Sequence, residues 1–160
     1  MPTHAQMDSR VAKRLLQKKK KLDEYRPMES FTVQRLHNDL RLMLTYHSNA
    51  IEGNTLSLAE TQMVLEYGVT IDGHPLREYL EATNHAEAFD TLPYLVRNPI
   101  TVETIHRLHH LVMAKIDPHA GELRTVPVYI RGADFTPPPA KEVPLYLVGQ
   151  LAIRRRLGVN

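Results

Sequence analysis

Apolar residues recur at helical spacing along most of the chain. Between Ser30 and Gly53 they return every three or four residues, which predicts one long helix that Gly53 ends. A second helix is predicted from Ser57 to Tyr67, because Ser57 has Glu60 three residues later in the capping-box arrangement. Further helices are expected to begin near Pro75, Thr101 and Val143, the first of them kinked or ended by Pro93.

The pattern changes after residue 118. Val126, Val128 and Ile130 point one way and Tyr129 and Arg131 the other, which predicts a short strand. Pro127 places that strand at an edge because it lacks a backbone donor. The sequence therefore predicts an all-α fold with one short β-hairpin over 124–138. We expect three regions: a polar and basic segment over 1–28, a helical region over 29–98 and a further region over 99–160.

Composition limits the class of protein. Hydrophobic residues make up 42% of the 160 positions, cysteine is absent and the formal net charge is +2. A dedicated nucleic-acid-binding domain usually has a larger and more clustered basic excess, so nucleic acid is an unlikely partner. No apolar run reaches the roughly 18 residues of a membrane span, and the N-terminus lacks the apolar core of a signal peptide. We expect a soluble, cytoplasmic protein without a membrane partner.

Residues 10–25 are an exception to the balanced charge. They are predicted to form a basic helix with a weak apolar stripe, and the run Lys18–Lys21 stands out. A solvated helix face explains such a run most simply. Binding to nucleic acid or to an acidic partner remains the alternative.

The segment from Ser48 to Asn54, Ser-Asn-Ala-Ile-Glu-Gly-Asn, contains the most informative position. Ser48 and Glu52 are four residues apart and so share one face of the predicted helix. Glu52 falls in the last turn, where the helix dipole disfavours a carboxylate by about 0.3–1 kcal/mol. Helix stability therefore does not explain Glu52, whereas a cationic partner outside the helix would.

This segment resembles the inhibitory helix of the Fic family, Ser/Thr-x-x-x-Glu-Gly/Asn. Ser48, Glu52 and Gly53 match that pattern, and Asn54 extends it to the Glu-Gly-Asn form found where the inhibitor precedes the catalytic core. The order of later segments agrees with the family over residues 30–150. These segments are Glu81 with Asn84 and Ala88, then 101–111, then Gly121-Glu122-Leu123-Arg124, and finally the flap from Val128 to Pro138.

The resemblance implies a protein adenylyltransferase, which transfers AMP from ATP to a hydroxyl group of a target protein with the help of Mg²⁺. Ser48, Glu52, Gly53 and Asn54 would be inhibitory. The flap would bind the target protein and cover the nucleotide, using Ile130, Arg131, Gly132, Ala133 and Arg124. Arg124 could instead simply close a turn.

The family's catalytic motif, His-Pro-Phe-x-Asp/Glu-Gly-Asn-Gly/Lys-Arg, does not occur in the sequence. His74-Pro75 begins a superficial match, but it comes too early in the order of elements and has no Gly-Asn to bind phosphate. We therefore expect a chain that is truncated before the motif, has no catalytic or metal-binding residues, binds ATP and Mg²⁺ weakly at best, and is inactive alone. The alternative is a protein-binding module that acts through the flap or on another Fic core, and self-association is possible.

Three histidines, His106, His109 and His110, include one pair four residues apart that could hold a metal from one helix face. No third ligand and no glutamate base accompany them. A structural role is therefore the expected one.

Overall fold

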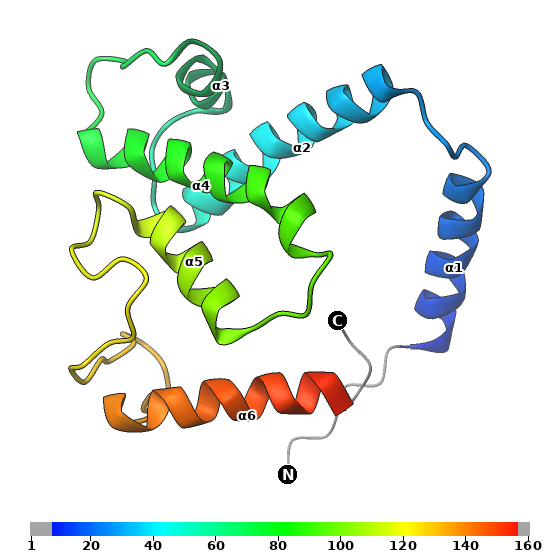
Figure 1. Cartoon of the computed structure of the whole chain (residues 1–160). Helices are drawn as coiled ribbons and strands as arrows, with labels where there is room; N and C mark the ends of the chain where they lie inside the picture. The colour runs from blue at the N-terminus through cyan, green and yellow to red at the C-terminus, as the bar shows by residue number, and fades with distance from the viewer. Residues whose placement is uncertain (1–7, 157–160) are drawn as a thin grey trace. The chain divides into compact units, whose positions relative to one another are not determined.

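The computed structural model describes the backbone of residues 8–156 and the side chains of residues 8–152. Six α-helices lie in that range, with a short 3₁₀ helix, Ala140–Glu142, before the last (Figure 1). They are α1 Ser9–Asp23, α2 Ser30–Ile51, α3 Leu58–Tyr67, α4 Leu76–Leu95, α5 Val102–Met113 and α6 Val143–Arg156. The predicted all-α fold is confirmed for this range. Among the described residues, no helix combines the length and the apolar character that a membrane span requires.

Local capping explains where the helices begin and end. The side chain of Ser57 accepts from the backbone N–H of Glu60, whose carboxylate accepts from the N–H of Ser57, so the predicted capping box is present. Gly68 ends α3 with a left-handed φ of 65°. Helix α4 continues through Pro93 to Leu95, so of the two expected effects of Pro93, a kink or an end, the end does not occur. So close to the helix end, the proline removes a helical hydrogen bond without breaking the rest.

The chain divides into two units, Met1–Asn38 and Asp39–Asn160. In the first unit, every residue of α1 except Ala12 is exposed. The second unit contains the core, in which α4 lies between α3 and α5 (Figure 1). Its buried apolar cluster consists of Leu56, Val64, Tyr79 and Ala82.

Small residues on α4 allow its neighbours to approach closely. Ala82, Ala86 and Ala88 are all buried, and the amide of Asn84 donates to the carbonyl oxygens of Val112 at 3.1 Å and Ala114 at 2.7 Å. These carbonyls lie at the end of α5, where helical partners are lacking. Asn84 therefore fixes the end of α5 against α4.

The predicted hairpin over 124–138 is not formed. The structure has no strand among the described residues, and this segment is an exposed loop with a turn in which the N–H of Ala133 donates to Ile130 at 3.2 Å. Gly132 supplies the left-handed φ of 79° in that turn. A strand needs a hydrogen-bonding neighbour, and the prolines at 127 and 137–139 remove donors from both arms of the loop.

Candidate functional site

Helix α2 ends in a Schellman motif. The N–H of Gly53 donates to the carbonyl of Ala50 at 3.1 Å, and the N–H of Asn54 donates to the carbonyl of Asn49 at 3.0 Å. Gly53 has a φ of 96°, a conformation that other residues rarely adopt. This geometry confirms that Gly53 ends the helix and places Glu52 at its C-cap position.

The Glu52 side chain is exposed at the negative end of the helix dipole. Among the side chains of residues 8–152, its carboxylate has no hydrogen-bond or ion-pair partner. Ser48, one turn earlier, is half-buried and does not hydrogen-bond to Glu52 in this part of the chain. The structure thus leaves a carboxylate at a position that disfavours it, with its charge available to a group from elsewhere.

The residues that follow Glu52 are, by contrast, firmly attached to α4. The amide of Asn54 donates to the carbonyl of Glu78 and to the carboxylate of Glu81, both at 3.0 Å, and its oxygen accepts from the N–H of Leu56 at 3.1 Å. The backbone N–H of Thr55 donates to the Glu78 carboxylate at 3.1 Å, and its hydroxyl donates to the same group at 2.8 Å. These bonds fix the turn that carries Glu52 against the core.

His74 completes this polar cluster. Its ring lies between two carboxylates, with Nδ1 3.1 Å from Glu78 and Nε2 3.5 Å from Glu60. Burial raises the pKa of Glu78, but hydrogen bonds from Thr55 and His74 outweigh it and hold that pKa below its usual value. His74-Pro75 is therefore a structural part of the α3–α4 connection rather than the start of a catalytic motif.

Arg124 closes the loop over 124–138. Its guanidinium donates to the carbonyl of Val126 at 3.1 Å and to the carbonyl of Pro138, so it joins the two ends of the loop. Of the predicted nucleotide-binding residues in the turn, Ile130, Arg131 and Gly132 are exposed and Ala133 is half-buried. Arg124 therefore has the turn-closing contacts that were the alternative to a site-facing role.

A cavity of about 620 Å³ lies between this loop, α5 and the start of α6. Val126, Val128 and Val143 give it apolar walls, and Asp117, Glu122 and Arg124 also line it. No hydrogen bond or ion pair joins its lining to the Ser48–Asn54 segment in the described part of the chain.

Two of the three histidines on α5 hold the turn beside this cavity. Nδ1 of His109 accepts from the N–H of Gly121 at 3.0 Å, and Nδ1 of His110 lies 3.0 Å from the carbonyl of Ala120. A Cβ at Gly121 would lie 2.9 Å from the Cβ of His110, and Gly121 has a φ of 88°. Both the close approach and the left-handed backbone therefore require glycine at this position. Across residues 8–152, no three His, Cys, Asp or Glu side chains are grouped to hold a metal ion.

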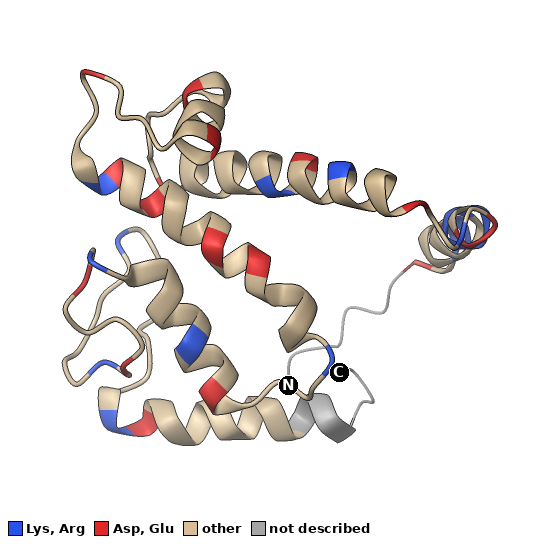
Figure 2. Cartoon of the chain, turned by 45° about the horizontal axis from the view of Figure 1, so that its top comes forward, with Lys and Arg blue, Asp and Glu red and all other residues tan. Residues whose placement is uncertain are grey.

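The sequence located Glu52 and Gly53 but not the side chains that hold them. Thr55, Glu60, His74 and Glu78 were missed as a group, because nothing in the spacing of residues links a loop at 55 to a helix at 78. The polar and small residues on one side of α4 were a partial signal. Figure 2 shows how acidic residues recur along that helix.

The fold is that of Fic-domain proteins. No family model matches the chain. A Fic-domain signaling protein from Bacteroides thetaiotaomicron superposes with a TM-score of 0.77 at 22% identity, covering 90% of this chain and 58% of that one. Fic-1 from Caenorhabditis elegans (residues 134–508) gives a TM-score of 0.69 at 30% identity, covering 95% of this chain and 45% of that one.

The sequence has relatives of the same kind. It is 34% identical over 128 residues to the protein adenylyltransferase fic-1 of Caenorhabditis briggsae, which covers 77% of this chain and 24% of that protein. It is 31% identical over 130 residues to the protein adenylyltransferase Fic of Aedes aegypti. The chain thus spans about a quarter of the length of these curated relatives. The chain belongs to the Fic family.

Proposed function

We propose that this chain forms the inhibitory and target-docking part of a Fic-type protein adenylyltransferase, and that Glu52 is the group that restrains AMP transfer. The observation that carries this proposal is the exposed carboxylate of Glu52 at the C-cap of α2, which has no partner among the side chains that the structure describes. An arginine that binds the γ-phosphate of ATP would be a cation suited to it, since an arginine can pair with a carboxylate through two parallel hydrogen bonds. While paired, that arginine would be withheld from the nucleotide.

The polar cluster beside Glu52 supports the same role. An inhibitory carboxylate must be held at a defined position, because a pair that first has to be ordered loses free energy to side-chain entropy. Asn54 and Thr55 attach the turn directly to α4 through side-chain and backbone hydrogen bonds. Ser48 would act by packing beneath Glu52 on the same helix face rather than by bonding to it.

The loop over 124–138 is suited to docking of the target protein. Val126, Val128, Tyr129 and Ile130 are exposed, and the loop has no strand beside it in the described part of the chain. An extended peptide that pairs with such a segment gains main-chain hydrogen bonds and places alternate side chains in pockets. The predicted hairpin would then form only with a target peptide present.

We propose that the described residues on their own bind ATP and Mg²⁺ only weakly. Mg²⁺ usually binds one or two carboxylates together with the phosphates of its nucleotide, and no three His, Cys, Asp or Glu side chains are grouped among residues 8–152. The guanidinium of Arg124 is already bonded to two loop carbonyls. We therefore assign no catalytic step to these residues and place the chain's contribution in inhibition and docking.

The proposal is tested with a chimera in which residues 30–150 replace the matching part of C. elegans Fic-1. Self-modification with labelled ATP is measured with Glu52 intact and with Glu52→Gly. We expect the variant to incorporate at least about tenfold more label, a change of about 1.4 kcal/mol in the activation free energy.

Glu66→Gly is the matched control, since Glu66 is an exposed glutamate near the end of α3. It should leave the rate unchanged. Equal rates for the unsubstituted chimera and the Glu52→Gly chimera, with both folded, would refute the inhibitory role.

A further inference from the structure

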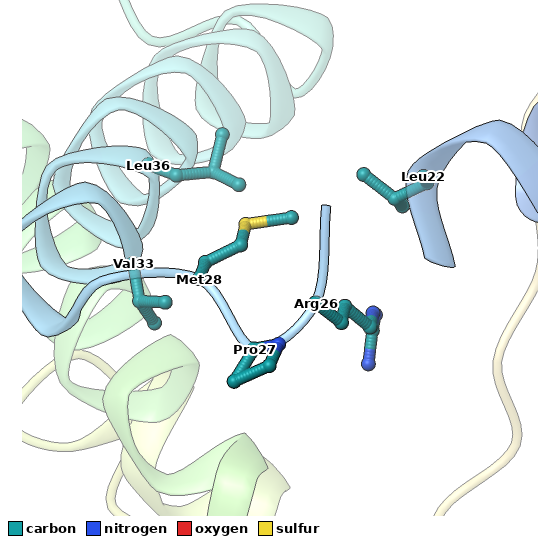
Figure 3. A pocket seen from close by; sticks show the side chains of 6 residues that line it. All are labelled: Leu22, Arg26, Pro27, Met28, Val33 and Leu36. Carbon is teal, nitrogen blue, oxygen red and sulfur yellow. The ribbon is translucent and has the colours of Figure 1, made fainter. Parts of the chain in front are cut away.

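The first unit contains an apolar cleft that the Fic site does not use. It lies where α1 is joined to α2 and is lined by Leu22, Arg26, Pro27, Met28, Val33 and Leu36. Figure 3 shows Leu22 of α1 facing Met28 and Leu36 across the opening. The cleft has a volume of about 640 Å³, and Leu22, Val33 and Leu36 remain 45%, 51% and 48% exposed. Apolar side chains gathered around a concavity are typical of a binding surface.

A basic groove adjoins this cleft on α1. It is lined by Arg14, Gln17, Lys18, Lys20, Lys21 and Glu24. Helix α1 has seven Lys or Arg residues and a single acidic one, Asp23. The two surfaces lie at the same end of α1, since Lys21 of the groove directly precedes Leu22 of the cleft.

Helical geometry sets the order of these groups around α1. With 3.6 residues per turn, Val11 and Leu15 lie within about 20° of Leu22 and form a narrow apolar stripe. Lys18, Arg14 and Lys21 lie about 40°, 80° and 100° from Leu22, all in the same direction. The surface therefore changes from apolar to basic across one side of the helix.

We propose that this cleft and groove bind an amphipathic helix of a partner protein, with leucine-like side chains in the cleft and acidic side chains along the groove. The narrow stripe suits a single helix, whose own apolar stripe is of similar width. The basic groove requires a partner that is acidic on one flank. This binding surface is independent of the inhibitory glutamate and of the loop over 124–138.

Other ligands fit the two surfaces less well. A nucleic acid would satisfy the basic groove but leave the apolar cleft unfilled, and the cleft has no aromatic side chain on which bases stack. An anionic bilayer would also attract α1, but it is flat on this scale, whereas the cleft is bounded by two helices. A helix fills both surfaces at once.

The test uses the full 160-residue chain and a fluorescein-labelled synthetic helix of about 18 residues, long enough to be partly helical. The helix has leucines at helical spacing on one face, glutamates on one flank and alanine elsewhere. Binding is followed by fluorescence anisotropy. We expect Leu36→Asp to weaken it at least about tenfold, because the charge would be buried in the cleft. Changing Lys18, Lys21 and Arg26 together to Gln should remove most of the salt dependence of peptide binding.

Leu44→Asp is the matched control, since Leu44 lies on the same helix with 44% exposure and outside the cleft. It should leave binding unchanged. Leu22→Asp tests the opposite wall and keeps the result interpretable if Leu36→Asp fails to fold.

Three results would overturn the proposal. They are an absence of binding, equal binding of a peptide with the same composition in scrambled order, and binding that Leu36→Asp and Leu22→Asp leave intact. Tighter binding to a DNA duplex, or to vesicles of equal parts phosphatidylglycerol and phosphatidylcholine, would assign the basic groove to that ligand instead. Dimerisation through the cleft, seen by sedimentation and lost in Leu36→Asp, would assign it to a second copy.

Discussion

Asn54→Ala should destabilise the protein measurably although Asn54 lies beside an exposed site. The substitution removes the donor to Glu78 and Glu81 and the acceptor of the Leu56 N–H. A neutral hydrogen bond contributes about 0.5–1.5 kcal/mol, and one to a charged group about 1.5–3 kcal/mol. Because Asn54 is only half-buried, we expect a loss slightly smaller than the lower ends of these ranges taken together, about 2 kcal/mol.

The free energy of unfolding is measured by urea titration followed by circular dichroism. For a chain of this size, about 2 kcal/mol corresponds to a fall in Tm of about 4–8 °C. Asn98→Ala, at an exposed asparagine, is the control and should change stability by less than about 0.5 kcal/mol.

At neutral pH, Asn54→Asp should lower the free energy of unfolding more than Asn54→Ala does, because it places a carboxylate against that of Glu81. If Asn54→Ala unfolds at the same urea concentration as the unsubstituted chain, the attachment of the turn after Glu52 to α4 is wrong.

Four further results are expected. Glu52→Ala should change the free energy of unfolding by less than about 0.5 kcal/mol, since an unpaired exposed carboxylate contributes little, and a loss of several kcal/mol in urea titration would make it a buried anchor. Arg124→Ala should expose the loop over 124–138 to limited proteolysis, and an unchanged cleavage pattern would contradict the clamp. Burial lowers the pKa of His85 below its ordinary value of 6.5, so stability should be complete above that pH and fall as the pH drops toward the folded-state pKa. In thermal melts, His85→Gln should lose the fall in stability that the His85 pKa causes below pH 6.5. Calorimetric titration of the chain with ATP should give an affinity weaker than micromolar.

The helices could be predicted because their signals are local. Ser57 and Glu60 are three residues apart, and Gly53 ends α2 through bonds that reach back only three and five residues. The family resemblance likewise followed from short segments in the right order. Such features depend only on residues that are close in the sequence, so they can be read without knowing the fold.

Contacts across the chain were not predictable in the same way. Asn54 bonds to Glu78 over a separation of 24 residues, and no periodicity records which distant residue a turn will meet. The hairpin prediction was wrong although its local pattern was present. Alternation of Val126, Val128 and Ile130 indicates residues able to form a strand, but a strand also needs a neighbour with free backbone groups.

The central claim is that the charge of Glu52 restrains AMP transfer, and Glu52→Gln in the Fic-1 chimera tests it most directly. Glutamine keeps the size and position of the side chain and removes only the negative charge, so the α2 cap and the Asn54 bonds stay in place. The account predicts that Glu52→Gln incorporates labelled AMP at least about tenfold faster than the unsubstituted chimera, close to Glu52→Gly. A Glu52→Gln chimera as slow as the unsubstituted one, while Glu52→Gly is fast, would show that the side chain acts by its bulk and would contradict the claim.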